Sequence, residues 1–181
     1  MCRNLTYLTG ICLLLLFNCG GGEPETPSKY PLAEDVSSLD GIIKAYYEVV
    51  SAPANKPKQV ERDHSLHHPD ARVAITGKDE AGKPYIRMMT LDEYYEGNEV
   101  APAGFFEKEI HRVTQRFGNI VHVFSTYEWR EEESGPVMGR GINSIQLYHD
   151  GDRWWVTSWI YDSERGDNPI PAEFLPHTEG L

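Results

Sequence analysis

Residues 137–161 read VMGRGINSIQLYHDGDRWWVTSWIY, and this stretch decides the fold class. Apolar and polar residues alternate on both sides of the central HDGD, which predicts strands over 137–148 and 153–161. An Asp-Gly pair between two alternating runs is the strongest short-range signal of a β-hairpin. We therefore expect the two strands to pair in antiparallel fashion around Asp150 and Gly151.

A hairpin loop of two or four residues fixes which side chains share a face, because side chains alternate along a strand. One face would carry four mainly apolar pairs, Leu147–Trp154, Ile145–Val156, Asn143–Ser158 and Gly141–Ile160. The other face would carry large, mixed side chains, among them Trp155, Trp159 and Tyr161. The first face is typical of an interior and the second of an interface. A loop of three or five residues would shift the register by one and break these pairs.

Upstream of the hairpin, helical and extended periods alternate. Apolar residues at three- and four-residue spacing over 39–50 predict a helix that begins near Ser37 or Ser38, with Ser37 and Asp40 as its capping pair. A second helix is expected over 58–66, and a third follows the Thr90-x-x-Glu93 capping signal. Further strands are expected over 72–76, 85–90, 105–117 and 120–130. This order predicts an α+β fold, in which a curved, mostly antiparallel sheet wraps around three helices from the N-terminal side of the chain.

The first 19 residues hold all three cysteines, Cys2, Cys12 and Cys19. The apolar segment 5–17 is too short to cross a bilayer as a helix and is typical of a secretory signal. A disulfide-stapled domain is excluded because no thiol follows residue 19. Cys19 ends the apolar run and precedes three glycines, which resembles the lipobox of bacterial lipoproteins, where this cysteine carries the acyl chains. An ordinary cleaved signal with an incidental Cys19 is the alternative.

These features divide the chain into four parts. They are a signal peptide (1–18), a lipidated cysteine with a flexible tether (19–35), a folded domain (36–165) and a Pro-containing tail (166–181). We therefore expect an exported protein of the bacterial cell envelope, anchored in the membrane through its N-terminal lipid. The net charge of −11 argues against nucleic-acid binding and against an electrostatic hold on anionic lipid.

The order of elements resembles the nuclear transport factor 2-like superfamily, a cone-shaped fold that includes SnoaL-like and ketosteroid-isomerase-like proteins. The segments that carry the resemblance are 42–50, His68-Pro69-Asp70-Ala71, 139–147 and 151–156. It covers about residues 36–165. The superfamily contains isomerases, hydrolases, dehydratases, cyclases and plain binding modules, so the resemblance implies no particular reaction. It does imply an internal pocket and a homodimer formed through the outer face of the sheet.

Five polar side chains are expected to contact a ligand inside the cone: Tyr46, His64, His122, Asn143 and Ser158. Tyr46 lies on the apolar stripe of the first helix, and His64 lies on the second helix. His122 lies in the middle of a strand, between two valines that face the other way.

Several kinds of site are not expected. The segment 72–76 has no Asp or Glu, so the base of a ketosteroid-isomerase-like mechanism is missing there. His64 and His68 have the helical spacing of metal ligands, but Pro69 disfavours helical backbone at His68, so no metal site is expected. The sequence contains no Gly-rich phosphate loop and no G-x-S-x-G motif, and no cofactor is expected.

Three hypotheses follow. The favoured one is a lipoprotein whose cone binds a small, largely apolar molecule without catalysing a reaction. The second is a SnoaL-like isomerase, hydrolase or dehydratase that uses His122 or His64 as its base. The third is a protein-interaction module that binds its partner through the aromatic outer face of the sheet.

Overall fold

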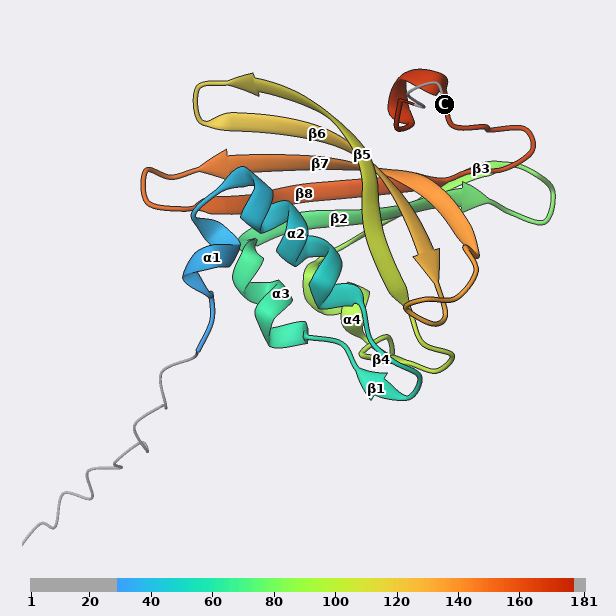
Figure 1. Ribbon diagram of the computed structural model, residues 1–181, viewed down its shortest axis with the longest axis horizontal. Helices are drawn as coiled ribbons and strands as arrows, with labels where there is room; N and C mark the ends of the chain where they lie inside the picture. The colour runs from blue at the N-terminus through green and yellow to red at the C-terminus, as the bar shows by residue number, and fades with distance from the viewer. Residues whose placement is uncertain (1–28, 178–181) are drawn as a thin grey trace, which may run out of the picture.

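The computed structural model describes residues 29–177, which form an α+β fold built on one large sheet (Figure 1). Its six strands lie in the order β3-β2-β8-β7-β6-β5. Neighbouring strands are antiparallel except β2 and β8, which are parallel. The strands are β2 (His67–Lys78), β3 (Pro84–Met89), β5 (Phe106–Phe117), β6 (Ile120–Arg130), β7 (Gly139–His149) and β8 (Trp154–Ser163). The expected fold class is confirmed.

Within residues 29–177 four α-helices gather on one side of this sheet (Figure 1). They are α1 (Ala33–Val36), α2 (Leu39–Val50), α3 (Val60–Leu66) and α4 (Leu91–Tyr95). A small ladder of β1 (Lys56–Pro57) and β4 (Val100–Ala101) and a 3₁₀ turn, η1 (Ala172–Phe174), complete the described part of the chain. Neither α1 nor the small ladder was expected from the sequence. None of these helices is long and apolar enough to span a membrane.

The helix starts follow local capping chemistry. Ser38, not Ser37, caps α2, and its hydroxyl accepts a hydrogen bond of 3.0 Å from the backbone N–H of Gly41. The proposed pairing of Ser37 with Asp40 was therefore wrong. Thr90 and Glu93 form the expected capping box at the start of α4.

The core lies between α2 and the concave face of the sheet. Ile42 and Val49 of α2 are fully buried, as are Val73, Val123 and Ile145 of three different strands. Burying one such side chain contributes roughly 1.5–3 kcal/mol to stability. The apolar stripe predicted for the first helix therefore fixes where the helix sits, across the inside of the curved sheet.

The predicted pairs of β7 and β8 were wrong along the whole hairpin. Near the loop Leu147 pairs with Val156 instead of Trp154, a shift of two residues that leaves the predicted faces unchanged. At the end far from the loop the faces differ as well. Asn143 was expected to pair with Ser158, whereas it pairs with Tyr161, and Ser158 pairs with Gln146. Ser158 and Ile160 consequently lie on the outer face of the sheet instead of the inner face.

A β-bulge in β8 causes this difference. Leu147 pairs with Val156, and the next residue, Gln146, pairs with Ser158. Thr157 is thus an extra residue in β8, and its hydroxyl donates a 3.1 Å hydrogen bond to the Gln146 carbonyl. One extra residue exchanges the two faces of a strand from that point onward. Beyond the bulge the residues of β8 that point inward are Trp159 and Tyr161.

The structure describes none of the predicted signal peptide but most of the predicted C-terminal tail. The signal peptide and Cys19 lie outside the described residues. The C-terminal segment folds back along the outer face, where the Phe174 ring packs 5.4 Å from that of Phe124. Thr126 donates a 2.5 Å hydrogen bond to the Phe174 carbonyl. The described elements therefore extend from Ala33 to Phe174.

Candidate functional site: an aromatic cavity inside the cone

The inside of the cone contains a cavity of about 270 Å³ between α2, α4 and the concave face of the sheet. Seven aromatic rings line it: Tyr46, Tyr94, Phe105, Tyr127, Trp129, Trp159 and Tyr161. Its polar lining includes Asp63, Glu107 and Asn143. A mainly aromatic wall with a few converging polar groups is typical of a small-molecule site.

Glu107 is the polar group that stands out in this cavity. It lies on β5 opposite Trp129, and Ser51 at the end of α2 holds its backbone by accepting a 3.0 Å hydrogen bond from its N–H. No hydrogen bond or ion pair to its carboxyl occurs among residues 29–177. Burial raises the pKa of Glu107 to about 8, and the positive charge of Lys58 opposes the rise only in part. At neutral pH this side chain is therefore mainly a neutral acid that can donate as well as accept a hydrogen bond.

The tyrosine hydroxyls around the cavity stay protonated. Burial, with a smaller contribution from the charge of Glu107, raises the pKa of Tyr46 and of Tyr94 well above the ordinary value. Tyr46 makes edge contacts with Tyr47 and Trp159, at ring distances of 5.2 and 6.3 Å, and no described residue hydrogen-bonds to its hydroxyl. Tyr46 is therefore a hydrogen-bond donor available to a ligand.

Asp63 and His67 form a second polar group at the wall. Tyr95 donates a 2.7 Å hydrogen bond to one Asp63 oxygen, while the other oxygen lies 3.2 Å from His67 Nδ1 without hydrogen-bond geometry. His67 Nδ1 instead points at the Asp63 carbonyl at 3.0 Å, and Trp159 Nε1 donates to His67 Nε2 at 3.1 Å. Nε2 must accept this bond, so the ring is the neutral tautomer with its hydrogen on Nδ1.

The charge state of His67 is linked to that bond. Burial lowers the pKa of His67, but the Asp63 carboxylate raises it by more, so the net shift is upward. Protonation at Nε2 would place two hydrogens between His67 and Trp159. An acidic medium is therefore expected to break the Trp159 bond.

The structure places two of the five expected site residues at the cavity, Tyr46 and Asn143. His122 lies on the outer face, where its Nε2 is 2.9 Å from Ser144 Oγ and its ring packs against Phe124. His64 lies at the surface beside Asp92, with 3.4 Å between Nε2 and the carboxylate. Ser158 faces outward, as the register requires. No group of three residues suited to a metal ion occurs within 29–177.

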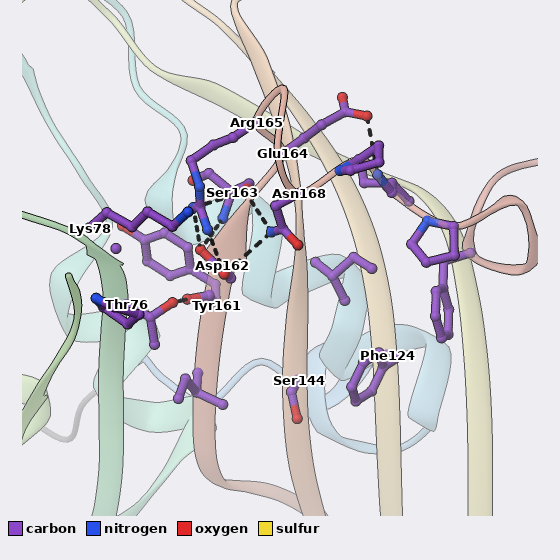
Figure 2. Close-up of a pocket in the computed structure, with 18 of the residues that line it drawn as sticks. Thr76, Lys78, Phe124, Ser144, Tyr161, Asp162, Ser163, Glu164, Arg165 and Asn168 are labelled. Atoms are coloured by element: carbon purple, nitrogen blue, oxygen red, sulfur yellow. Dashed lines mark hydrogen bonds and ion pairs between the residues drawn. The ribbon is translucent and has the colours of Figure 1, made fainter. Parts of the chain in front are cut away.

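A second and larger hollow lies on the outer side of the sheet. It has a volume of about 560 Å³ and lies between β2, β3, β8 and the returning C-terminal segment (Figure 2). Its floor is largely apolar and includes Phe124, Ile142 and Ile160. We call this hollow the outer groove.

The charged side chains of the outer groove are paired with one another. Lys78 pairs with Asp167. Arg165 pairs with Asp162 at 2.6 and 3.0 Å (Figure 2). Arg165 Nε makes no hydrogen bond but lies 3.8 Å from Asp167. Glu164 accepts hydrogen bonds from Arg140 and from the Ile170 backbone. These pairs join the C-terminal segment to the sheet.

The residues that sequence reasoning missed are Glu107, Asp63 and His67 together with the ring of Trp159. Glu107 falls in a run of charged residues, Glu107-Lys108-Glu109, which reads as solvent-facing. Asp63 and His67 are separated by four residues, a spacing at which side chains meet on a helix, and this signal was available. Trp159 was missed because no sequence pattern marked the bulge at Thr157.

Comparison with known proteins identifies the fold. No family model matches the chain, and no curated protein matches it. A structure assigned as a Ca/calmodulin-dependent kinase II association domain, from Exiguobacterium sibiricum, is 14% identical with a TM-score of 0.50, covering 76% of this chain and 98% of the other. LinA is 10% identical with a TM-score of 0.51, covering 75% and 89%.

A third similar structure is the β subunit of an aromatic-ring-hydroxylating dioxygenase from Novosphingobium aromaticivorans. It is 16% identical with a TM-score of 0.50, covering 74% of this chain and 95% of the other. Identities this low establish the fold and leave the activity open. With its curved six-stranded sheet closed over α2, this chain shares the cone-shaped α+β fold of these three structures, the fold that its resemblance to the nuclear transport factor 2-like superfamily implied.

Proposed function

We propose that this protein binds a small, largely apolar molecule in the aromatic cavity of its cone. The observation that carries the proposal is the Glu107 carboxyl, which lies among aromatic rings with no partner among the described residues. Glu107 is partly buried, and its carboxyl gains a hydrogen bond when a ligand with a polar group fills the cavity. The cavity volume of about 270 Å³ suits a molecule of one or two rings.

A second candidate function is acid–base catalysis by Glu107. Its raised pKa of about 8 lies close to neutral pH, where a carboxyl works best as a general acid or base. Tyr46 would supply a hydrogen bond to an oxygen that gains charge in the reaction. Glu107 replaces His64 and His122 in this role, because neither histidine lines the cavity. LinA, a hexachlorocyclohexane dehydrochlorinase, has the same fold, which is compatible with proton removal from an apolar substrate.

Native mass spectrometry of the purified protein tests the binding proposal. A small mass that is lost on denaturation is expected from the wild type. It should be absent or reduced in Glu107→Ala and unchanged in Glu131→Ala, which alters an exposed loop carboxylate. Retention of the same mass in Glu107→Ala would show that the ligand sits elsewhere, with the outer groove as the next place to look.

The proposal includes the cellular localisation of the protein. Cys19, preceded by an apolar segment and followed by Gly20–Gly22, would carry the lipid that anchors an exported protein. Labelling cells with an alkyne analogue of palmitate is expected to mark the wild type and Cys12→Ser, and to leave Cys19→Ser unmarked. Equal labelling of all three would refute an anchor at Cys19.

The homodimer and the protein-interaction module stay predictions. The outer face has a different composition from the one expected, because Trp159 and Tyr161 point inward. A partner that binds this face would contact Trp155 and Tyr148 instead.

A further inference from the structure

We propose that the cavity selects molecules that carry a hydrogen-bond donor, an N–H or O–H group, which points at Asn143 Oδ1. The inference rests on the proposed binding function and names the class of ligand. Its support is a chain of hydrogen bonds that begins at the protein surface and ends at Asn143.

The chain begins at an ion pair. Arg112 binds both oxygens of Glu109, at 2.5 to 3.0 Å, and also reaches Asp40 at 2.8 Å. Glu109, paired in this way with a guanidinium, is a carboxylate and can only accept hydrogen bonds. Ser125 donates to it at 2.5 Å. The direction of the first bond is therefore fixed.

The direction of each following hydrogen bond is determined by the one before it. The Ser125 hydroxyl has one hydrogen, which goes to Glu109, so it must accept from the Tyr47 hydroxyl 2.6 Å away. Tyr47 has likewise used its one hydrogen and must accept from Asn143, whose Nδ2 lies 3.2 Å away. The opposite assignment of the Asn143 amide would place oxygen lone pairs of Asn143 and Tyr47 against each other.

The result is an amide of fixed orientation at the cavity wall. Asn143 lines the cavity and turns Nδ2 toward Tyr47, so Oδ1 is the atom left for a ligand. No described residue donates to Oδ1. Tyr47, Ser125 and Asn143 are all buried, with 4%, 0% and 3% of their surface exposed, so the chain is shielded from competing water.

A fixed acceptor discriminates between ligands of the same shape. A molecule with a donor at this point satisfies Oδ1, whereas one with an acceptor or a C–H group leaves it unpaired. Sites built to hydrogen-bond a ligand reject analogues that lack the group, since the buried partner then stays unsatisfied. Asn143 would thus determine specificity, and Glu109, Ser125 and Tyr47 would be positioning residues.

Indole and benzofuran test this, because they have nearly the same shape but offer an N–H donor and an oxygen acceptor, respectively. Binding to the full chain is measured by calorimetry and by the fluorescence of the cavity tryptophans. The wild type is expected to prefer indole about tenfold. In Tyr47→Phe, which frees the Asn143 amide to rotate, the preference should fall to about twofold or less. Ser144→Ala, a neighbouring change on the outer face, should keep it.

Glu109→Gln is a second variant. It keeps the shape of the side chain, but because an amide can donate as well as accept, the hydrogen bonds from residue 109 to Asn143 can then point in either direction. Its preference for indole should also fall, even if Tyr47→Phe folds poorly. Equal binding of both probes to the wild type would overturn the donor requirement and leave the proposed function standing. Absence of binding by either probe would count against both proposals.

Discussion

The aromatic cavity and the outer groove have about 270 and 560 Å³, and the smaller one is the better candidate site. Charged side chains in the outer groove form ion pairs, Lys78 with Asp167 and Arg165 with Asp162, and Arg165 Nε is left without a hydrogen bond. In the cavity, Glu107, the Tyr46 hydroxyl and Asn143 Oδ1 have no hydrogen-bond partner within residues 29–177. Native interiors satisfy most of their polar groups, so unsatisfied groups point to a ligand more reliably than volume does.

The largest expected difference between the cavity side and the outer side of the sheet is in the loss of stability on mutation. Substituting one tryptophan of β8 on each side tests it. Trp159 points into the cavity, is 5% exposed and bonds His67, whereas Trp155 lies on the outer face. Trp159→Ala is expected to lower the free energy of unfolding by about 3–5 kcal/mol, and Trp155→Ala by about 1 kcal/mol. Urea denaturation compares them. Equal losses would mean that the bulge at Thr157 does not hold in solution.

The second difference is in pH dependence. The folded-state pKa of Glu107 is about 8, above its unfolded value, so the folded protein binds more protons. The contribution of Glu107 to the stability of the folded protein is therefore fully present below about pH 4 and is lost as the pH rises to 8. At pH 8.5, Glu107→Gln should be more stable than the wild type by at least about 2 kcal/mol, since solvent screening reduces the full effect of a shift from 4.5 to about 8, and at pH 4 the two should match.

Urea denaturation at both pH values checks this prediction. Glu131→Gln is the control, since that carboxylate is exposed and should leave the pH profile unchanged. If wild type and Glu107→Gln kept parallel profiles from pH 4 to 8.5, Glu107 would be an ordinary solvated carboxylate.

A third prediction concerns the contact that closes the outer groove. Phe174→Ala removes the ring that packs on Phe124 and should cost about 1 kcal/mol. It should not alter the affinity of the cavity for indole, because η1 lies on the opposite face of the sheet. Glu173→Ala, an exposed neighbour, should change neither quantity. A loss of indole binding in Phe174→Ala would join the two regions into one functional unit.

The smallest effect is expected at the charged edge of the outer groove. Lys78 and Asp167 are both partly exposed to solvent, and such ion pairs contribute between 0 and about 1 kcal/mol. Lys78→Met should change the unfolding midpoint by less than the effect of Phe174→Ala. A larger loss would show that the C-terminal segment depends on this pair.

Local chemistry made much of the fold predictable. The apolar stripe of α2, the Thr90–Glu93 capping box and the Asp-Gly hairpin each depend on residues close in sequence, and each is present. The α+β class followed from their order. Ser37 was chosen over Ser38 as the cap because both residues suit the position, and only the backbone geometry separates them.

The cavity was predictable only in part, because its residues come from distant segments. Tyr46 and Asn143 were found from periodicity, since the register up to their positions in α2 and β7 was regular. Ser158 was misplaced because Thr157 carries no residue-type signal of a bulge. Glu107 was overlooked because its burial results from α2 and β6 closing over it, which no local pattern encodes.

The bulge at Thr157 also makes the content of the cavity depend on the register of one strand. If β8 kept its length and paired with β7 without the bulge, Ser158 and Ile160 would turn inward in place of Trp159 and Tyr161. The same amino acids would then form a smaller, partly polar wall instead of an aromatic one. Deleting Thr157 removes the extra residue and leaves Trp159 and Tyr161 facing inward, so the aromatic wall depends on how the strand pairs and not on the presence of Thr157 itself.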